Sequence, residues 1–340
     1  MDANSKVIWS KMLLRKYVAA ALPPSLLTVA VHKELYAPRL RRRPIALVYG
    51  NCQAEAVRRI LSTHAGFARE YQLLRVPAVH EITERQLALI KRRLPVVDVL
   101  IAQQVKDGYR DMELGTDQLI EHLRPDARVV RWPVAYYEGL HPFLAYINLG
   151  SPIAVDAPIT SYHDVRIIYA AQQGWGVERT VEFLRDFHVD PAWIRDTAEG
   201  SLVELARREE RLDVKLSGAI ADPAVHLHSF MTVNHPSNRL ITEVAKQTLD
   251  HLGIANSEVV LEARQTYLDH LMAPREPQVL AALGLDGSST QSDWIVHGTA
   301  VPLRDVVEAH LAQYAEAPEL VPAGMNKHTD RLQALGLAAA

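Results

Sequence analysis

Alternating apolar strands and amphipathic helices between residues 45 and 132 constrain the fold of this chain most strongly. The run at 45–49 is continuously apolar, as expected for a strand that is buried on both faces of a parallel sheet. Further strands are expected at 71–79, 96–102 and 128–132, and helices directly after the first strand, at 83–93 and at 117–123. Strands and helices that alternate at this short spacing indicate an α/β fold, in which a parallel sheet is wound with helices.

The chain becomes mainly helical after about residue 150. Amphipathic or charge-rich helices are expected at 177–187, 201–212 and 239–252, the last one ended by Gly253. We therefore predict an α/β catalytic domain with a large helical insertion, followed by a helical C-terminal part packed on the same unit. The predicted boundaries are 1–43 for a basic N-terminal extension, 44–255 for the catalytic domain with its insertion at about 151–212, and 256–340 for the C-terminal region.

The N-terminal extension is strongly basic, with nine Lys and Arg residues against two acidic ones. Its apolar stretch at 17–31 is broken by Pro23 and Pro24 and is too short to span a bilayer as a helix. Two interpretations remain open for it. It is either an extra helix on the core with a solvated basic linker, or a segment that contacts an anionic membrane surface or a partner.

Charge and cysteine content exclude several classes of protein. The formal net charge of -3 argues against broad binding to nucleic acid, which needs a basic face. A single cysteine excludes an internal disulfide framework and a multi-cysteine metal site. It also agrees with a protein of the reducing cytoplasm. If the basic extension binds a membrane, the protein is expected at the inner face of that membrane. His226 and His228 alternate in sequence but lack further ligands, so no metal is expected.

The junction between the first strand and its helix reads Gly50-Asn51-Cys52-Gln53. Gly50 allows a sharp turn, and Cys52 lies near a helix N-terminus, where the partial positive charge favours the thiolate and lowers the thiol pKa. Free backbone N–H groups at this end could also stabilise an oxyanion. We predict that Cys52 is a nucleophile, with an inert buried cysteine as the alternative.

A cysteine that performs acyl chemistry needs an imidazole nearby. His235 lies in a polar loop before a long helix and is the preferred general base. His141 follows the fourth strand, with Glu138 three residues upstream as an orienting carboxylate. Gln104, at the end of the third strand, either donates its amide to an oxyanion or bonds to nearby backbone.

The strand–Gly50-Asn51-Cys52-Gln53–helix opening resembles the WcbI family of polysaccharide biosynthesis enzymes, whose layout is similar to that of SGNH esterases. Gly50-Asn51-Cys52 stands where the Gly-Asp-Ser nucleophile block of those esterases ends the first strand. His235-Pro236-Ser237 resembles their Asp-x-x-His block, but Thr232 stands where the aspartate would be, which leaves the third triad member open.

Further matches extend the resemblance over roughly residues 44 to 255. They are Asp98, Gln104, Tyr109-Arg110 and Gly139-x-His141-Pro142.

The resemblance implies coenzyme A binding and transfer of an acyl group, typically acetyl from acetyl-CoA, to a sugar hydroxyl of a capsular or related polysaccharide. The expected coenzyme contacts are Gly50, Asn51, Gln53, Lys106 and Arg110, where the two cations could meet phosphate groups. Two alternatives remain: an esterase or thioesterase that uses the same cysteine with water, and a non-catalytic protein that binds the coenzyme or a glycan. Dinucleotide and P-loop signatures do not occur.

Overall fold

A four-stranded parallel sheet forms one half of the molecule in this computed structural model, which describes residues 43–151, 154–222, 226–255 and 266–337. Its strands lie in the order β2-β1-β3-β4, and every neighbouring pair is parallel. The strands are β1 (Ile45–Tyr49), β2 (Gln72–Leu74), β3 (Val99–Gln103) and β4 (Arg128–Trp132). The expected α/β class is confirmed.

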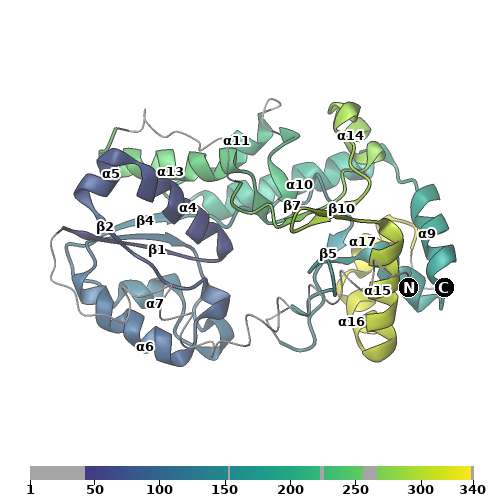
Figure 1. Cartoon of the computed structure of the whole chain (residues 1–340), viewed down its shortest axis with the longest axis horizontal. Helices are drawn as coiled ribbons and strands as arrows, with labels where there is room; N and C mark the ends of the chain where they lie inside the picture. The colour runs from purple at the N-terminus through teal and green to yellow at the C-terminus, as the bar shows by residue number, and fades with distance from the viewer. Residues whose placement is uncertain (1–42, 152–153, 223–225, 256–265, 338–340) are drawn as a thin grey trace.

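Helices cover both faces of this sheet (Figure 1). Alternate side chains of β1 enter different cores: Ala46 and Val48 pack with helices α4 and α13, whereas Leu47 and Tyr49 pack on the side of α6 and α7. This alternation explains why the strand is apolar throughout. The covering helices are α4 (Cys52–Thr63), α5 (Ala65–Glu70) and α13 (Asn238–Leu252) on one face, with α6 (Glu84–Arg93) and α7 (Thr116–Ile120) on the other.

Polar caps and one glycine fix the ends of these helices. Thr83 closes a capping box with Gln86 at the start of α6, as its sequence position predicts. Gly253 adopts a left-handed conformation with φ 75° and ends α13. Asp98 accepts a 2.6 Å hydrogen bond from the backbone N–H of Ile45 at the amino end of the sheet, so it lies at the opposite edge from the β1–α4 junction.

The other half is mainly helical and faces the carboxyl ends of the parallel strands (Figure 1). Three small antiparallel sheets connect its helices: β5 with β6, β7 with β8, and a sheet in the order β11-β10-β9. Its helices are α8 (Val165–Gln172), α9 (Val177–Asp186), α14 (Pro277–Ala282), α15 (Leu303–Glu316), α16 (Leu320–Lys327) and α17 (Thr329–Ala334). Two more helices, α10 (Pro191–Glu209) and α11 (Ser217–Ala221), contribute to the core on the α4 and α13 face of the sheet. The strands are β5 (Leu144–Ala145), β6 (His163–Asp164), β7 (Phe230–Thr232), β8 (His235–Pro236), β9 (Leu271–Met272), β10 (Trp294–Val296) and β11 (Thr299–Val301).

Several predicted boundaries are wrong for identifiable reasons. The second strand stops at Leu74 instead of 79, because Pro77 intervenes and residues 79–81 form a 3-10 turn. The third strand starts at Val99, since Pro95 lies in another 3-10 turn. Strands β9 to β11 were not expected in the C-terminal region, because each has only two or three residues.

The basic extension expected at 1–43 lies, apart from its last residue, outside the described residues, and so does its expected membrane contact. Among the helices of the described ranges, none has the length and apolar character needed to cross a bilayer.

Candidate functional site

The β1–α4 junction places Cys52 at the first residue of helix α4, at the carboxyl edge of the sheet. Gly50 has no room for a side chain, because an added Cβ would overlap Gln103 Oε1. The same oxygen accepts a 2.7 Å hydrogen bond from the backbone N–H of Asn51, and Asn51 Oδ1 caps the helix by accepting from Gln53 N at 2.9 Å. The tight turn expected from Gly50 is therefore present and is held by a neighbouring strand.

Gln53 and Gln103 form a fully buried amide pair, which we call the amide hub. Gln103 Nε2 donates to Gln53 Oε1 at 2.9 Å. Gln53 Nε2 in turn donates to the carbonyl oxygens of Ala135 and Asn234, both at 2.8 Å, and Ala135 N donates back to Gln53 Oε1 at 3.0 Å. The hub thus fixes the start of α4 to the segment after β4 and to the loop that carries His235.

The electrostatic prediction for Cys52 is wrong. Burial raises the pKa of the Cys52 thiol to about 11, although the backbone N–H groups of Gln53 and Cys52 act to lower it. The carboxylate of Glu81 adds a smaller effect that also raises the pKa. The loss of hydration of the buried thiolate raises the pKa by more than the helix N-terminus lowers it. The thiol is therefore protonated at neutral pH.

Two tyrosines lie within electrostatic range of Cys52. Burial raises the pKa of Tyr146 to about 12 and that of Tyr162 well above its usual value, and the charge of Cys52 contributes to both increases. The Tyr162 hydroxyl donates to Asn234 Oδ1 and lies 2.9 Å from Thr232 Oγ1. Thr232 therefore bonds to a tyrosine instead of orienting an imidazole.

His235 begins strand β8 directly after Asn234, instead of lying in the polar loop expected from the sequence; we keep the name His235 loop for this β7–β8 turn. The imidazole is buried and lies nearly perpendicular to the Tyr162 ring, at 6.3 Å between centroids. Burial lowers its pKa to about 4, with a further contribution from His270. The imidazole is therefore neutral at physiological pH and able to accept a proton. Its Nδ1 lies 3.5 Å from the carbonyl oxygen of Leu271, which stands in the place of an orienting carboxylate.

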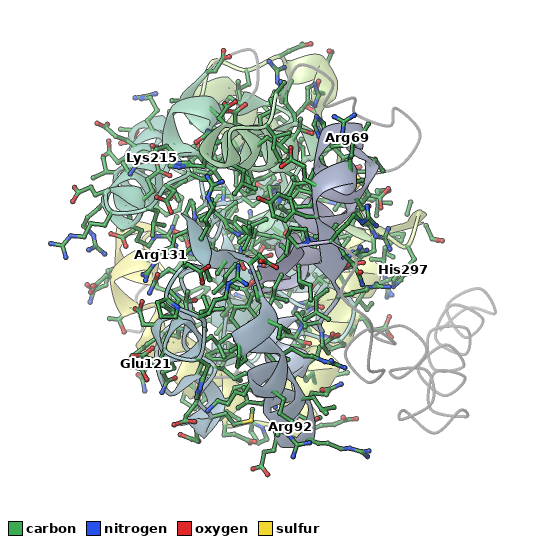
Figure 2. All side chains as sticks on the ribbon, turned by 90° about the vertical axis from the view of Figure 1, so that its left-hand side faces the viewer. Arg69, Arg92, Glu121, Arg131, Lys215 and His297 are labelled. Carbon is green, nitrogen blue, oxygen red and sulfur yellow. The ribbon has the colours of Figure 1, made fainter. Side chains whose placement is uncertain are left out.

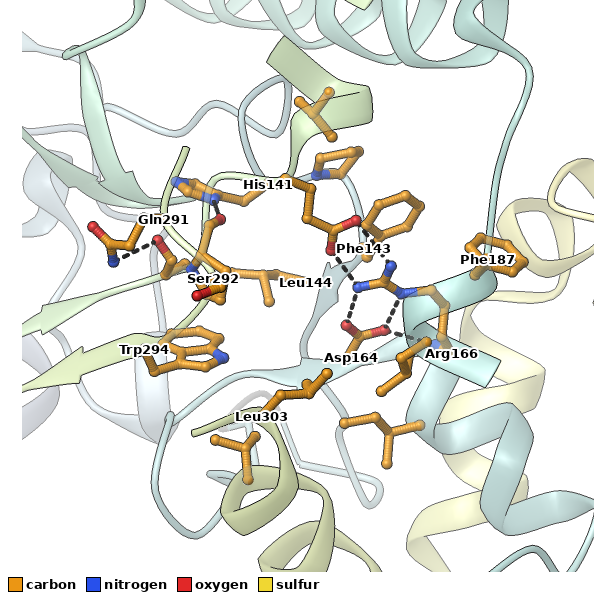
Figure 3. Close-up of a pocket in the computed structure, with 18 of the residues that line it drawn as sticks. His141, Phe143, Leu144, Asp164, Arg166, Phe187, Gln291, Ser292, Trp294 and Leu303 are labelled. Atoms are coloured by element: carbon orange, nitrogen blue, oxygen red, sulfur yellow. Dashed lines mark hydrogen bonds and ion pairs between the residues drawn. The ribbon is translucent and has the colours of Figure 1, made fainter. Parts of the chain in front are cut away.

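His141 lies in a different environment from His235. It lines a cavity of about 320 Å³ whose walls do not include Cys52 (Figure 3). Its Nδ1 is 3.2 Å from the carbonyl oxygen of Pro274, and burial lowers its pKa to about 4. The expected pairing with Glu138 is absent, because that carboxylate accepts from Tyr136 at 3.0 Å and from Arg331 at 2.7 Å.

Gln104 points away from the junction. Its side chain is exposed, Nε2 donates to Asp117 at 3.0 Å, and Oε1 accepts from Arg131 at 3.0 Å. Arg131 lies at the surface that Figure 2 presents. Successive strand residues point to opposite faces, so it is Gln103 that reaches the site, and the oxyanion role predicted for Gln104 has no support in this geometry.

The two cations expected to bind phosphate, Lys106 and Arg110, have different surroundings in the loop after β3. Lys106 is exposed, whereas Arg110 donates from Nη1 to the carbonyl oxygen of Ile82 at 2.9 Å. Ile82 follows the turn whose Val79 N–H donates to the Gly50 carbonyl at 2.8 Å. Arg110 is thereby held against the loop that flanks the junction.

A second basic group combines two residues of α4, nearly two turns after Cys52, with one residue that follows β2. Arg58, Arg59 and Arg75 all contact the carboxylate of Glu55, at 2.6, 3.3 and 2.6 Å respectively. We call these three residues the arginine cluster; with Glu55 it carries a surplus of two positive charges. Sequence reasoning did not select Arg75, because its proximity depends on β2 pairing beside β1.

In the part of the chain that the structure describes, no group of three or more His, Cys, Asp or Glu residues is arranged to hold a metal ion. His226, one of the two alternating histidines, instead has Nε2 2.6 Å from the hydroxyl of Tyr137.

Comparison with known proteins gives two matches. A family model described as the polysaccharide biosynthesis enzyme WcbI matches residues 45–257, more than half of the chain. The chain is also similar to a solved structure described as WcbI, a novel polysaccharide biosynthesis enzyme. That structure is described as the native protein without a disulfide bond between coenzyme A and a cysteine. That similarity covers 88% of this chain and 100% of the other, with a TM-score of 0.73 and 21% identity. No curated protein matches the chain.

Proposed function

We propose that this chain, which belongs to the WcbI family of polysaccharide biosynthesis enzymes, transfers an acyl group from coenzyme A to a carbohydrate hydroxyl. The observation that carries the proposal is the placement of its single cysteine. Cys52 begins α4 at the carboxyl edge of a parallel sheet, where α/β proteins bind their ligands, and the amide hub fixes it beside the His235 loop. The related solved structure is described in terms of coenzyme A and a cysteine, which supports the same pairing here.

The high thiol pKa of Cys52 requires a base in this mechanism. In the proposed first step, neutral His235 takes the thiol proton while Cys52 Sγ attacks the thioester carbonyl. The bond between the acyl carbon and the coenzyme sulfur breaks, and the departing thiolate takes the proton from His235. The acceptor hydroxyl then attacks the acyl-cysteine, its proton passes through His235 to the Cys52 sulfur, and the acylated sugar leaves.

Backbone donors support the charge that develops on the carbonyl oxygen. The N–H groups of Cys52 and Gln53 lie at the start of α4 and already favour negative charge on the Cys52 sulfur, but that of Gln53 also donates to the capping Asn51 Oδ1, so we assign the oxyanion contact to the Cys52 N–H. Donors that are fixed before the reaction stabilise an oxyanion without further reorganisation. The amide hub supplies that fixation by holding the residue after Cys52 through its side chain.

Coenzyme A carries several negative phosphate charges, and a chain with a net charge of -3 needs a local cationic surface to bind them. The arginine cluster supplies such a surface, with Arg58 and Arg59 on the helix that begins with Cys52 and Arg75 directly after β2. Arg110 supplies a further cation at the loop beside Gly50. We assign the phosphates to these residues in preference to the exposed Lys106.

Intact-mass spectrometry of the protein mixed with acetyl-CoA tests the proposal. The wild type should gain the mass of one acetyl group when acceptor is absent, and Cys52→Ser, whose hydroxyl is a weaker nucleophile, should gain much less. Release of the acetyl group to water at the same rate with and without a sugar acceptor would make the protein an esterase. Saturable coenzyme binding without acetylation in any condition would leave it a binding protein.

A further inference from the structure

The start of α4 offers one free backbone donor to the negative charge that develops on the acyl oxygen, the N–H of Cys52. The N–H of Gln53 is occupied, because it donates to Asn51 Oδ1 at 2.9 Å. Sites that transfer acyl groups combine fixed donors from the backbone and from side chains, since each donor stabilises the charge of the tetrahedral intermediate. A second donor is therefore expected among the side chains that face Cys52.

Tyr146 is a half-buried residue that directly follows strand β5. Its ring lies 5.3 Å from the ring of Tyr162 between centroids, at an angle of 54°, and its carbonyl oxygen lies 3.0 Å from His328 Nε2. Tyr162 lines the 320 Å³ cavity, whereas Tyr146 does not. The Tyr146 side chain also interacts electrostatically with Cys52, so it is a candidate for the second donor.

Tyr162 is unsuited to that role, because its hydroxyl is enclosed by other side chains. The residue is only 3% exposed. Its hydroxyl donates to Asn234 Oδ1 and lies 2.9 Å from Thr232 Oγ1. An acyl oxygen could reach it only by displacing these partners, which would leave buried polar groups unpaired.

The Tyr146 hydroxyl has the protonation state and the contacts of a donor. Burial raises the pKa of Tyr146 to about 12, so the hydroxyl is protonated at neutral pH. Its contacts with Tyr162 and Asn234 act in the opposite direction on the pKa, which is the effect of groups that donate to the phenol oxygen. The Tyr146 oxygen is thus the acceptor in both contacts, and its own proton remains available to a substrate.

Asn234 connects this tyrosine pair with the reacting cysteine. Its backbone carbonyl oxygen accepts from the Gln53 side chain at 2.8 Å, and Gln53 is the residue next to Cys52. The charge of Cys52 contributes to the pKa of both tyrosines, so both lie near the sulfur. A donor that is held in place by the amide hub needs no reorganisation when the charge forms.

We propose that the Tyr146 hydroxyl is the second oxyanion donor of the acyl transfer, beside the Cys52 N–H. This inference rests on the proposed function and names a further catalytic residue for it. When Cys52 Sγ bonds to the acyl carbon, the carbonyl π electrons move to the oxygen, which accepts hydrogen bonds from both donors. Tyr146 keeps its proton throughout. The electron pair returns to the carbonyl as the bond to the coenzyme sulfur breaks, and that sulfur takes the proton from His235.

Two reagents that react with the same sulfur separate this role from a general effect on the site. Acetyl-CoA forms a tetrahedral oxyanion, whereas iodoacetamide is attacked at a saturated carbon and loses iodide without forming one. Tyr146→Phe should slow the acetylation of Cys52, followed by intact-mass spectrometry, by about 10²–10³-fold. Its alkylation rate should stay within about twofold of wild type, because the fraction of thiolate is the same, and its affinity for coenzyme A should not change.

Two further proteins serve as controls. Tyr169→Phe removes a hydroxyl from α8, where the Tyr169 ring packs against Trp175 and Phe183, and both of its rates should equal those of wild type. Fluorotyrosine in place of Tyr146 retains a hydroxyl that is more acidic and therefore a stronger donor. It should be acetylated at least as fast as wild type, and a fall to the rate of Tyr146→Phe would contradict the assignment.

The outcomes distinguish this inference from the proposed function. Equal acetylation of Tyr146→Phe and wild type would refute the oxyanion role alone. Parallel losses of acetylation and alkylation would also refute it, since Tyr146 would then only position the cysteine. An unfolded variant would alkylate faster, because its thiol pKa falls toward 9.0, and the fluorotyrosine protein then decides. Absence of acetylation in the wild type would refute the proposed function and this inference with it.

Discussion

The protonation of Cys52 can be tested through the alkaline stability of the protein. Burial raises the pKa of this thiol from 9.0 to about 11, so the folded protein holds the proton more tightly than the unfolded chain does. The stabilisation is complete below pH 9, where both states are protonated, and is lost as the pH rises toward 11. Two pKa units correspond to about 3 kcal/mol of unfolding free energy, of which about 1.4 kcal/mol is already lost at pH 10.

Urea unfolding at intervals from pH 8 to pH 11 measures this loss. Buried tyrosines titrate in the same range, so the informative quantity is the difference between the wild type and Cys52→Ser, in which the thiol contribution and its smaller coupling to Tyr146 and Tyr162 are missing. The unfolding free energy of the wild type should fall relative to the variant by about 1.4 kcal/mol between pH 8 and pH 10. Parallel curves for the two proteins would refute the reasoning.

Alkylation by iodoacetamide gives an independent reading of the same thiol. In the native protein the labelling rate should rise with a midpoint near pH 11, and in urea near 9.0. At pH 8 about one thiol in a thousand is then ionised in the folded state. A native midpoint at or below 9.0 would mean that the helix N-terminus outweighs burial, which is the outcome that the sequence alone predicts.

Three further predictions concern the side chains around the junction. His235→Ala should lower the turnover rate by about 10²–10⁴-fold, because it removes the general base. The activity of the wild type should not change with pH above about pH 5, because the His235 imidazole is neutral above its pKa of about 4. A rate profile that changes strongly near pH 6.5 would contradict this assignment. Gln103→Leu should lower the unfolding free energy by about 2–4 kcal/mol through unpaired buried groups, whereas Gln104→Leu should change it by less than about 0.5 kcal/mol in the same urea titration. Arg75→Gln should weaken coenzyme A binding about tenfold by calorimetry, while Arg207→Gln should leave it unchanged, because Arg207 is exposed on α10 and pairs with Glu204 outside the arginine cluster.

The strand-to-helix junction could be predicted because its determinants are local. An apolar run, Gly50, and an amphipathic pattern after Cys52 are all adjacent in sequence, and the fourth strand was located to the residue at both ends. Capping by Thr83 and termination by Gly253 are equally local. Each of these features depends on backbone conformation and on the next few side chains, which the sequence states directly.

The environment of the site could not be predicted in the same way. The thiol pKa of Cys52 depends on how deeply packing from other segments buries it, and a helix N-terminus alone indicated the opposite sign. Gln103 and Gln104 are indistinguishable by type, and one residue of strand register decides which of them faces the junction. Arg75 comes next to Glu55 only through strand pairing.

The amide hub also has a consequence for the order in which the chain folds. Its hydrogen bonds join residues separated by 50, 82 and 181 positions, so each requires a longer loop to close than the contacts within a helix do. Contacts of such high sequence separation form late, since their loop entropy must be overcome before they contribute. During synthesis, β1 and α4 emerge well before the His235 loop, and until that loop arrives Cys52 lacks the packing that keeps its thiol protonated. The nascent chain therefore passes through a period in which its single cysteine is more acidic and more open to oxidation than it is in the finished protein.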